Sequence, residues 1–441
     1  MRKYNLEPTR ENILLSLKED TISRNSELIS MIKILEEIEG NFFIALDGEW
    51  GTGKTFFVKQ LELILNYLRQ KMFEEEFVAD REIESIIENS NKLKNLNLEQ
   101  GYFVHYYNAW LYDNHTDPML SIIYSILKDW QFKANTTISQ RIKNNIVQVL
   151  KSVQFWNIGS IGTAIENLNG TDILQEIGTL EETKVKIKEI FDEIINERCN
   201  RLIIVIDELD RCNPNYAVSL LERLKHFFDD DRIIFLLSIN KSQLIHTISN
   251  CYGTNFDSTG YLNKFFDFNL KMNKVDSSKY VISKGVLKDD RFILNKMGLD
   301  MLNYMNFSMR DASIYINQIN FINEKVNKES YNSEYLFISL FLPIVVAFRI
   351  SDVQKSNLIE NGNGEDILNH IIENNTNLQR LILRLDSKEG NEEERLERSK
   401  LEYFKIYDFL TKGMNNKESH RFDIDWDFKN YFWNLVNSYC K

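Results

Sequence analysis

The sequence predicts an α/β fold in which a parallel sheet is wound with helices and is followed by a mostly helical C-terminal region. Short apolar runs, rich in the branched and aromatic residues of strands, recur at 41–47, 102–109, 201–206 and 232–239. Amphipathic helical patterns follow the first three runs, at 56–71, 118–132 and 216–228. Strands and helices that alternate in this way form a parallel sheet. From about residue 276 onward the patterns are helical.

A helix leads into the first of these strands. Its apolar residues are three or four positions apart and make one face, at Leu28, Ile29, Ile32, Leu35 and Ile38. The run 41–47 is followed by a glycine, as expected of a buried parallel strand. Residues 133–198 interrupt the alternation with a helical insertion, most regular at 181–198. The pattern thus predicts a core at 1–275 and a helical lid and interaction region at 276–441.

Composition limits the class of protein. A chain of 441 residues that is 43% hydrophobic can bury a large core. Its net charge of -12 disfavours binding of phosphate backbones over the whole surface, although a local basic groove remains an option. The four cysteines form no CxxC pair, and the N-terminus has no apolar signal segment. These features favour a cytoplasmic protein with reduced thiols.

Two apolar runs are candidates for a membrane span. The run 335–348 is shorter than the roughly 20 residues that a spanning helix needs and contains Pro343, which favours a buried helix and no transmembrane segment. The run 155–165 is shorter still and contains Gly159 and Gly162. A loop or hairpin packed on the core is expected there, with contact to a membrane or a partner as the alternative.

The strongest functional signal is the sequence GEWGTGKT at 48–55, which fits GxxxxGK[ST] between a predicted strand and a predicted helix. Glycines permit a tight loop whose N–H groups form an anion nest beside the positive end of the helix. Lys54 is expected to reach the β- and γ-phosphates, and the Thr55 hydroxyl to bind Mg²⁺. The predicted nucleotide-binding residues are Gly48, Glu49, Trp50, Gly51, Thr52, Gly53, Lys54, Thr55 and Phe56.

A second signal has the form of a Walker B motif. The sequence RLIIVIDELD at 201–210 runs from a buried strand directly into two acids. Asp207, at the carboxyl end of that strand, is predicted to reach the Mg²⁺ shell. Glu208 is then suitably placed to orient or deprotonate the attacking water. With the P-loop, this motif predicts a P-loop nucleoside triphosphatase.

The third signal is RIIFLLSIN at 232–240, a strand that ends in a polar side chain. Asn240 could contact the γ-phosphate or the water as a sensor. It could equally serve as the N-cap of the helix that starts near Lys241, and the two roles do not exclude each other.

These segments together resemble the KAP family of P-loop ATPases, a STAND-like group within the additional-strand NTPases. The resemblance rests on the P-loop, on an aromatic-x-Ala-Trp ending of the second strand at 107–110, on the continuation DELDRC at 207–212, and on Asn240. It covers about 20–275, with weaker support to about 320 from YLNKF at 261–265 and MRD at 309–311.

The resemblance implies more than the motifs do. The family commonly has Asp-Asp-Leu-Asp-Arg in Walker B, whereas Glu208 here resembles the general base of related ATPases. Many members insert transmembrane helices between the two motifs, and this chain has only the run 155–165 there, so it is closer to the soluble members. ATP is favoured over GTP. Bacterial members often serve in anti-phage and mobile-element conflict systems beside a separate effector.

Further residues receive roles with alternatives. Trp110 is expected to be a buried aromatic anchor, or else to position a nucleotide-responsive loop. Arg211 could act as an arginine finger in a neighbouring subunit, or pair with Asp210 in its own chain. Arg310 resembles a second sensor arginine from a helical lid, or is a plain surface residue.

The remaining signals are structural. The six histidines show no metal-ligand spacing and are expected to be structural. The aromatic segment 423–441 is expected to be a docking face or a core element, with base stacking as the lesser alternative.

The sequence therefore favours a Mg-ATP-binding ATPase that acts as a nucleotide-driven switch. It is expected to form a homo-oligomer or to act on a separate effector protein. The alternatives are a nucleotide-holding scaffold with little turnover and a nucleic-acid-stimulated ATPase, which the acidic composition disfavours.

Overall fold

The computed structural model describes residues 7–21, 23–73, 81–115, 117–133, 141–142, 144–149, 170–273, 275–279, 293–326, 333–413 and 425–439. The chain divides into two compact units, one of Pro8–Lys274 and one that contains Val275–Lys441. Each unit has buried hydrophobic clusters of its own. The predicted run 155–165 lies outside the described residues.

Within the described residues of the first unit, five strands form one parallel sheet. They are β1 (Phe42–Asp47), β2 (Tyr102–Asn108), β3 (Arg201–Asp207), β4 (Ile233–Ile239) and β5 (Phe268–Lys271). The strand order is β2-β3-β4-β1-β5, and neighbouring strands are parallel. Strand β4 therefore lies between the strands that lead into the P-loop and Walker B, and the carboxyl ends of all five strands share one edge.

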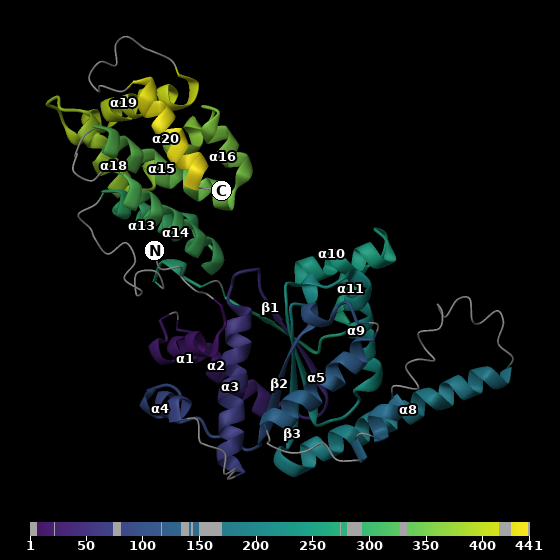
Figure 1. Ribbon diagram of the computed structural model, residues 1–441. Coiled ribbons are helices and arrows are strands. Elements are labelled where there is room, and N and C mark those ends of the chain that lie inside the picture. Colours follow the sequence, from purple (N-terminus) through teal and green to yellow (C-terminus); the bar gives the residue numbers. More distant parts are fainter. Residues whose placement is uncertain are drawn as a thin grey trace. The chain divides into compact units, whose positions relative to one another are not determined.

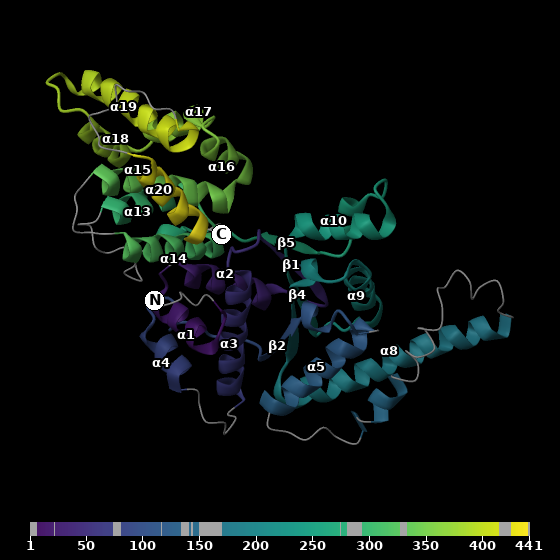
Figure 2. The ribbon, with the colours of Figure 1, turned by 45° about the horizontal axis from the view of Figure 1, so that its top comes forward.

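Helices cover both faces of this sheet (Figures 1 and 2). One face carries α1 (Arg10–Glu19), α2 (Arg24–Glu37), α3 (Lys54–Met72) and α4 (Arg81–Asn89). The other carries α5 (Pro118–Lys133), α8 (Gly170–Arg198), α9 (Pro214–Phe227), α10 (Lys241–Tyr252) and α11 (Ser258–Asn263). Short 3₁₀ turns, η1 (Ala109–Tyr112) and η2 (Leu209–Arg211), follow β2 and β3.

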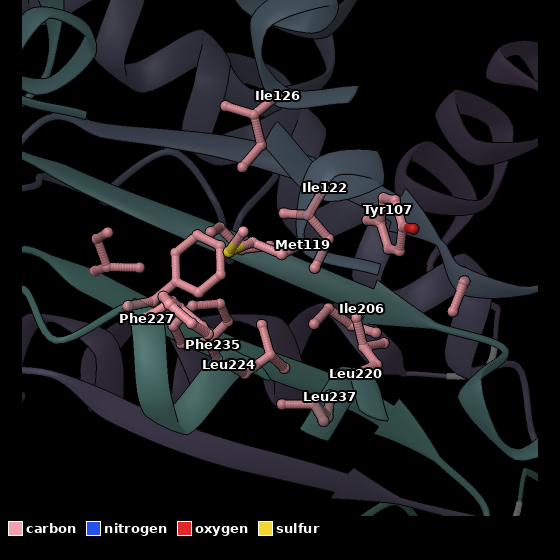
Figure 3. Close-up of a cluster of buried hydrophobic side chains, with 14 of the residues drawn as sticks. Tyr107, Met119, Ile122, Ile126, Ile206, Leu220, Leu224, Phe227, Phe235 and Leu237 are labelled. Carbon is pink, nitrogen blue, oxygen red and sulfur yellow. The ribbon is translucent and has the colours of Figure 1, made fainter. Parts of the chain in front are cut away.

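Strand alternation separates the two hydrophobic clusters. Successive side chains of a strand point to opposite faces. In β3, Ile203 and Val205 belong to the cluster under α1–α4, and Ile204 and Ile206 to the cluster under α5–α11. Figure 3 shows the second cluster, in which Phe235 of β4 lies among side chains of α5 and α9. When both faces of a sheet are buried, each central strand appears in the sequence as a continuous apolar run, as β3 and β4 do.

The predicted α/β fold is confirmed, and the four predicted strands are present at nearly their predicted bounds. Strand β5 was not predicted from the sequence. It has four residues, FNLK, most of them exposed, and it pairs only with β1 at the edge of the sheet. A short edge strand carries no apolar run that would reveal it.

The described residues of the second unit are helical. The helices are α13 (Ile293–Met305), α14 (Met309–Lys325), α15 (Ser333–Ser351), α16 (Val353–Glu360), α17 (Glu365–Glu373), α18 (Thr376–Ile382), α19 (Glu392–Lys412) and α20 (Trp426–Tyr439), with the 3₁₀ turn η3 (Leu383–Leu385). They share one hydrophobic cluster. Helix α20 contributes Phe428, Phe432 and Leu435 to this cluster, so one face of it is a core element, while its Trp426 and Tyr431 are exposed.

Helix α15 is the core helix of this unit. It is the one described helix that is long and apolar enough to cross a membrane by length and composition, and 72% of that stretch is buried inside the protein. The tyrosine Tyr403 stacks on its Phe341 with ring centroids 4.4 Å apart. The predicted buried helix at 335–348 is thus confirmed.

We predict that Phe235→Ala lowers the free energy of unfolding by about 3–5 kcal/mol, because truncation of a buried aromatic residue removes its packing and leaves a cavity. The Phe235 ring is fully buried and lies 4.7 Å from the ring of Phe43 and 5.6 Å from that of Phe228. Urea unfolding measures the loss. Val185→Ala, at an exposed position of α8, is the control and should change it by less than about 0.5 kcal/mol. A similar small change for both variants would contradict this account of the core.

Candidate functional site

The carboxyl edge of the sheet brings the two sequence motifs together. Asp47 ends β1, Asp207 ends β3, and Ser238 lies beside Asp207 in the register of β4. Asn108, the last residue of β2, pairs with Asp207 from the other side. Ligands bind at this edge in open parallel sheets.

The loop 48–53 has the backbone of an anion nest. Gly51 and Gly53 have φ of 80° and 88°, a region that glycine enters at little cost. The Gly48 N–H donates to Ile239 O at 3.1 Å, which ties the loop to β4. A Cβ at Gly48 would lie 2.9 Å from Thr52 Oγ1, so this glycine also makes room for the loop. Helix α3 begins at Lys54 and directs its positive end at the loop.

Lys54 lies folded into this loop. Its Nζ donates to Gly48 O at 2.5 Å and to Glu49 O at 3.1 Å. Burial lowers the pKa of Lys54, while the nearby carboxylates of Asp210, Asp207, Asp47 and Glu208 oppose that shift. The ammonium therefore occupies the mouth of an anion nest within a group of acids, and phosphate oxygens would be better acceptors than the two carbonyls.

The Asp207 carboxylate accepts hydrogen bonds on both oxygens. Its Oδ2 accepts from Thr55 Oγ1 at 2.7 Å and from the Tyr106 hydroxyl at 3.0 Å. Its Oδ1 accepts from Ser238 Oγ at 2.7 Å and from the Glu208 N–H at 3.0 Å. Thr55 and Asp207 thus present a hydroxyl and a carboxylate side by side, which are the oxygen ligands that Mg²⁺ prefers.

Glu208 has an unusual backbone conformation and an ion-pair partner. Its φ is 62° and ψ is 22°, a left-handed conformation that costs a residue with a side chain about 1–3 kcal/mol. The carboxylate pairs with Arg211 Nε, one turn along η2. Burial and the charge of Asp207 raise the pKa of Glu208, and Arg211 counteracts this rise. A carboxylate with a raised pKa can accept a proton from water more readily than an ordinary one.

Two tryptophans contact residues of η2, Trp50 from the loop and Trp110 from η1. Trp50 Nε1 donates to Asp210 Oδ2 at 2.6 Å. The Arg211 guanidinium lies over the Trp110 ring, 5.8 Å from its centroid. The predicted pairing of Arg211 with Asp210 is therefore not seen, because Glu208 holds the arginine and Trp50 holds Asp210. The prediction that Trp110 is a buried anchor is wrong, since 51% of this residue is exposed.

The remaining predicted residues lie in different surroundings. Asn240 caps α10, with its Oδ1 accepting from Gln243 N at 3.4 Å and from Ser242 Oγ at 2.8 Å. Phe56 packs partly buried against the cluster under α1–α4. Arg310 is the second residue of α14, in the helical unit. The roles of Asn240 and Arg310 as sensors remain predictions.

Three contacting residues were not predicted. Ser238 and Tyr106 bond to Asp207, and Arg24 donates to the P-loop carbonyl of Thr52 at 3.2 Å. Ser238 had a signal, since it is the one polar residue within the apolar run of β4. Tyr106 and Arg24 had none, because their contacts depend on strand register and on a helix that lies upstream of the motif.

Among the described residues no group of three or more histidines, cysteines or acids is arranged to hold a metal ion on its own. His105 is buried with its Nδ1 2.8 Å from Asp129 Oδ2, which fits the structural role predicted for it.

The chain matches a known family over the residues that contain both motifs. A family model described as the KAP family P-loop domain matches residues 24–326. No curated protein matches the chain. The matched residues run from Arg24, through the P-loop and Walker B, to the end of α14.

We predict that Lys54→Ala abolishes tight nucleotide binding, because the loop then loses the charged group that reaches the outer phosphates. The loss should exceed about a hundredfold in affinity, the effect of a charge-assisted hydrogen bond of up to about 3 kcal/mol. Equilibrium binding of a fluorescent ATP analogue with Mg²⁺ measures it. Lys71→Ala, near the other end of α3, is the control and should bind as the wild type does. Unchanged affinity in Lys54→Ala would contradict the site.

Proposed function

Because the chain belongs to the KAP family of P-loop NTPases, we propose that it binds ATP with Mg²⁺, hydrolyses it, and acts as a nucleotide-driven switch. The observation that carries the proposal is the arrangement around Asp207. Its carboxylate meets Thr55 of the P-loop at 2.7 Å, and Glu208 follows it directly. Metal ligand, phosphate loop and base thus lie together.

The chain's own residues account for nucleotide binding. The N–H groups of the loop and the end of α3 receive the phosphates, and Lys54 exchanges its bonds to Gly48 O and Glu49 O for the outer phosphate oxygens. Thr55 and Asp207 would hold Mg²⁺. When bound, the metal would neutralise charge that develops between the β- and γ-phosphates. Tyr106 and Ser238 keep the Asp207 carboxylate oriented towards Thr55.

Glu208 is the base in this mechanism. Burial and Asp207 raise its pKa towards the range in which a carboxylate can accept a proton from water. Arg211 holds the carboxylate in an ion pair, so Glu208 must be released, or shared, before it can orient the water. This pairing supports a switch, because activity then depends on a rearrangement of η2.

The rival function is a scaffold that holds nucleotide without useful turnover. Lys54, Thr55 and Asp207 suffice for it, and Glu208 would be idle. A third function, hydrolysis stimulated by nucleic acid, predicts faster phosphate release on addition of polynucleotide. The net charge of -12 disfavours it. The setting we propose, a bacterial anti-phage or mobile-element conflict system with a separate effector, rests on the family resemblance.

We predict that Glu208→Gln keeps ATP binding and lowers turnover by about 10²-fold or more, because it removes the base and leaves Asp207 intact. Phosphate release and analogue binding are measured on the same preparation. Glu222→Gln, a change on α9 that affects contacts with Tyr252 and Tyr261, is the control and should turn over normally. Equal and negligible rates in wild type and Glu208→Gln would leave the scaffold as the function.

We further predict that ATP promotes self-association and that Arg211 completes the site of a neighbouring copy. The side chain is partly exposed and lies over the ring of the exposed Trp110, which gives it a surface to share. Such an arginine contributes about 10³-fold or more to turnover in phosphoryl transfer.

A mixing experiment tests this prediction. Lys54→Ala keeps Arg211 but lacks the lysine that binds the phosphates. Arg211→Ala keeps that lysine but lacks the arginine. An equimolar mixture should recover turnover that neither variant has alone, and the mass of Glu208→Gln in solution should rise with Mg-ATP. If the mixture stays inactive and the mass is unchanged, Arg211 acts within its own chain on Glu208.

A further inference from the structure

Arg24, the first residue of α2, is a buried arginine that touches the P-loop. It is 5% exposed. Its Nη2 donates to the carbonyl oxygens of Thr52 at 3.2 Å and Asn273 at 2.7 Å, and its Nη1 pairs with Glu27. A buried guanidinium is tolerated only with such acceptors, because removing it from water is costly. The side chain therefore joins the loop to Asn273, two residues after the end of β5.

The contact with Thr52 fixes a peptide group of the nest. A trans peptide directs its C=O and its N–H to opposite sides. The bond from Arg24 to the Thr52 oxygen thus directs the Gly53 N–H away from Arg24. Gly53 has φ of 88° and no side chain to restrain this peptide, so the restraint comes from outside the loop. N–H groups of such loops hold the phosphates.

The contact with Asn273 lies where the chain leaves the sheet. Strand β5 pairs with β1, the strand that leads into the P-loop, from Ile44↔Phe268 to Asp47↔Lys271. The Met272 N–H then donates to Asp47 O at 2.7 Å, and Met272 Cβ would lie 3.4 Å from a Cβ at Gly48. Residue 274 ends the first unit, and Val275 belongs to the helical one. The exit segment is thus bonded to the last residue of β1 through the backbone of Met272, and to the phosphate loop through Arg24.

We propose that Arg24 is a positioning residue that holds the P-loop in its phosphate-binding conformation and couples that conformation to the exit segment 268–273. Phosphate binding fixes the Thr52–Gly53 peptide, the Thr52 oxygen fixes the guanidinium, and the guanidinium fixes Asn273. Binding of nucleotide thereby restrains the segment through which the chain leaves the ATPase core towards the helical unit. This inference rests on the proposed nucleotide switch and names its route.

The test is hydrogen exchange and equilibrium binding with a non-hydrolysable ATP analogue and Mg²⁺. In the wild type, the analogue should slow exchange at 48–55 and also at 268–273. Arg24→Met should weaken binding about tenfold or more, as expected for a lost charge-assisted hydrogen bond. At saturating analogue it should keep the slowing at 48–55 and lose it at 268–273.

Two further variants make the result specific. Arg24→Lys keeps the charge beside Glu27 but lacks the fork that reaches two carbonyls, so it should also lose the slowing at 268–273. It decides the question even if Arg24→Met fails to fold. Arg201→Met is the matched control. Arg201 begins β3, at the opposite end of the strand from Asp207, and is also 5% exposed. It donates to the carbonyls of Ile38, Gly40 and Asp231. The variant should leave analogue affinity and both regions unchanged.

The outcomes separate the inference from the function. A wild type that neither binds the analogue nor slows exchange at 48–55 refutes the proposed function. A wild type that slows exchange at 48–55 but not at 268–273 refutes the coupling alone. Arg24→Lys with wild-type affinity and wild-type slowing at 268–273 refutes it as well.

Discussion

The carboxyl edge of the sheet depends on the hydrogen bonds that the buried carboxylate of Asp207 accepts. This residue is 2% exposed, and a charge in such a place costs several kcal/mol unless donors satisfy it. The donors come from different elements: Thr55 from α3, Tyr106 from β2 and Ser238 from β4. They meet only when β2, β3 and β4 are in register and α3 begins at the right residue. The hydrogen bonds that orient the proposed metal ligand Asp207 therefore form only when the sheet has folded correctly.

The parts of this edge that local sequence determines were predictable. The loop 48–55 and the strand that ends at Asp207 carry their chemistry within a few residues, and an apolar run followed by a glycine or an acid signals each. Ser238, Tyr106 and Arg24 depend on partners far along the chain, so no local spacing reveals them. For Trp110 the local pattern was misleading. An aromatic residue after a buried strand suggests burial, but the turn of η1 exposes this side chain.

The backbone at Glu208, directly after strand β3, is strained. Glu208 adopts a left-handed backbone, and its carboxylate is held by Arg211 within the same 3₁₀ turn. The Asp210 carboxylate of the same turn accepts a hydrogen bond from Trp50 of the P-loop. A movement of the loop that breaks this bond would therefore act on the turn that holds Glu208.

Three hydrogen bonds lead from the loop 48–53 to different parts of the core. Gly48 bonds to the end of β4, Trp50 to Asp210 after β3, and the Thr52 oxygen to Arg24 on α2. Gly51 and Gly53 have positive φ, and the Thr52 and Lys54 side chains bond to carbonyls within the loop. Under the proposed function, phosphates that order the loop would act on all three bonds together. The bond of Trp50 leads to the turn that holds Glu208, and the bond of Arg24 leads to Asn273, so a single binding event would act on both.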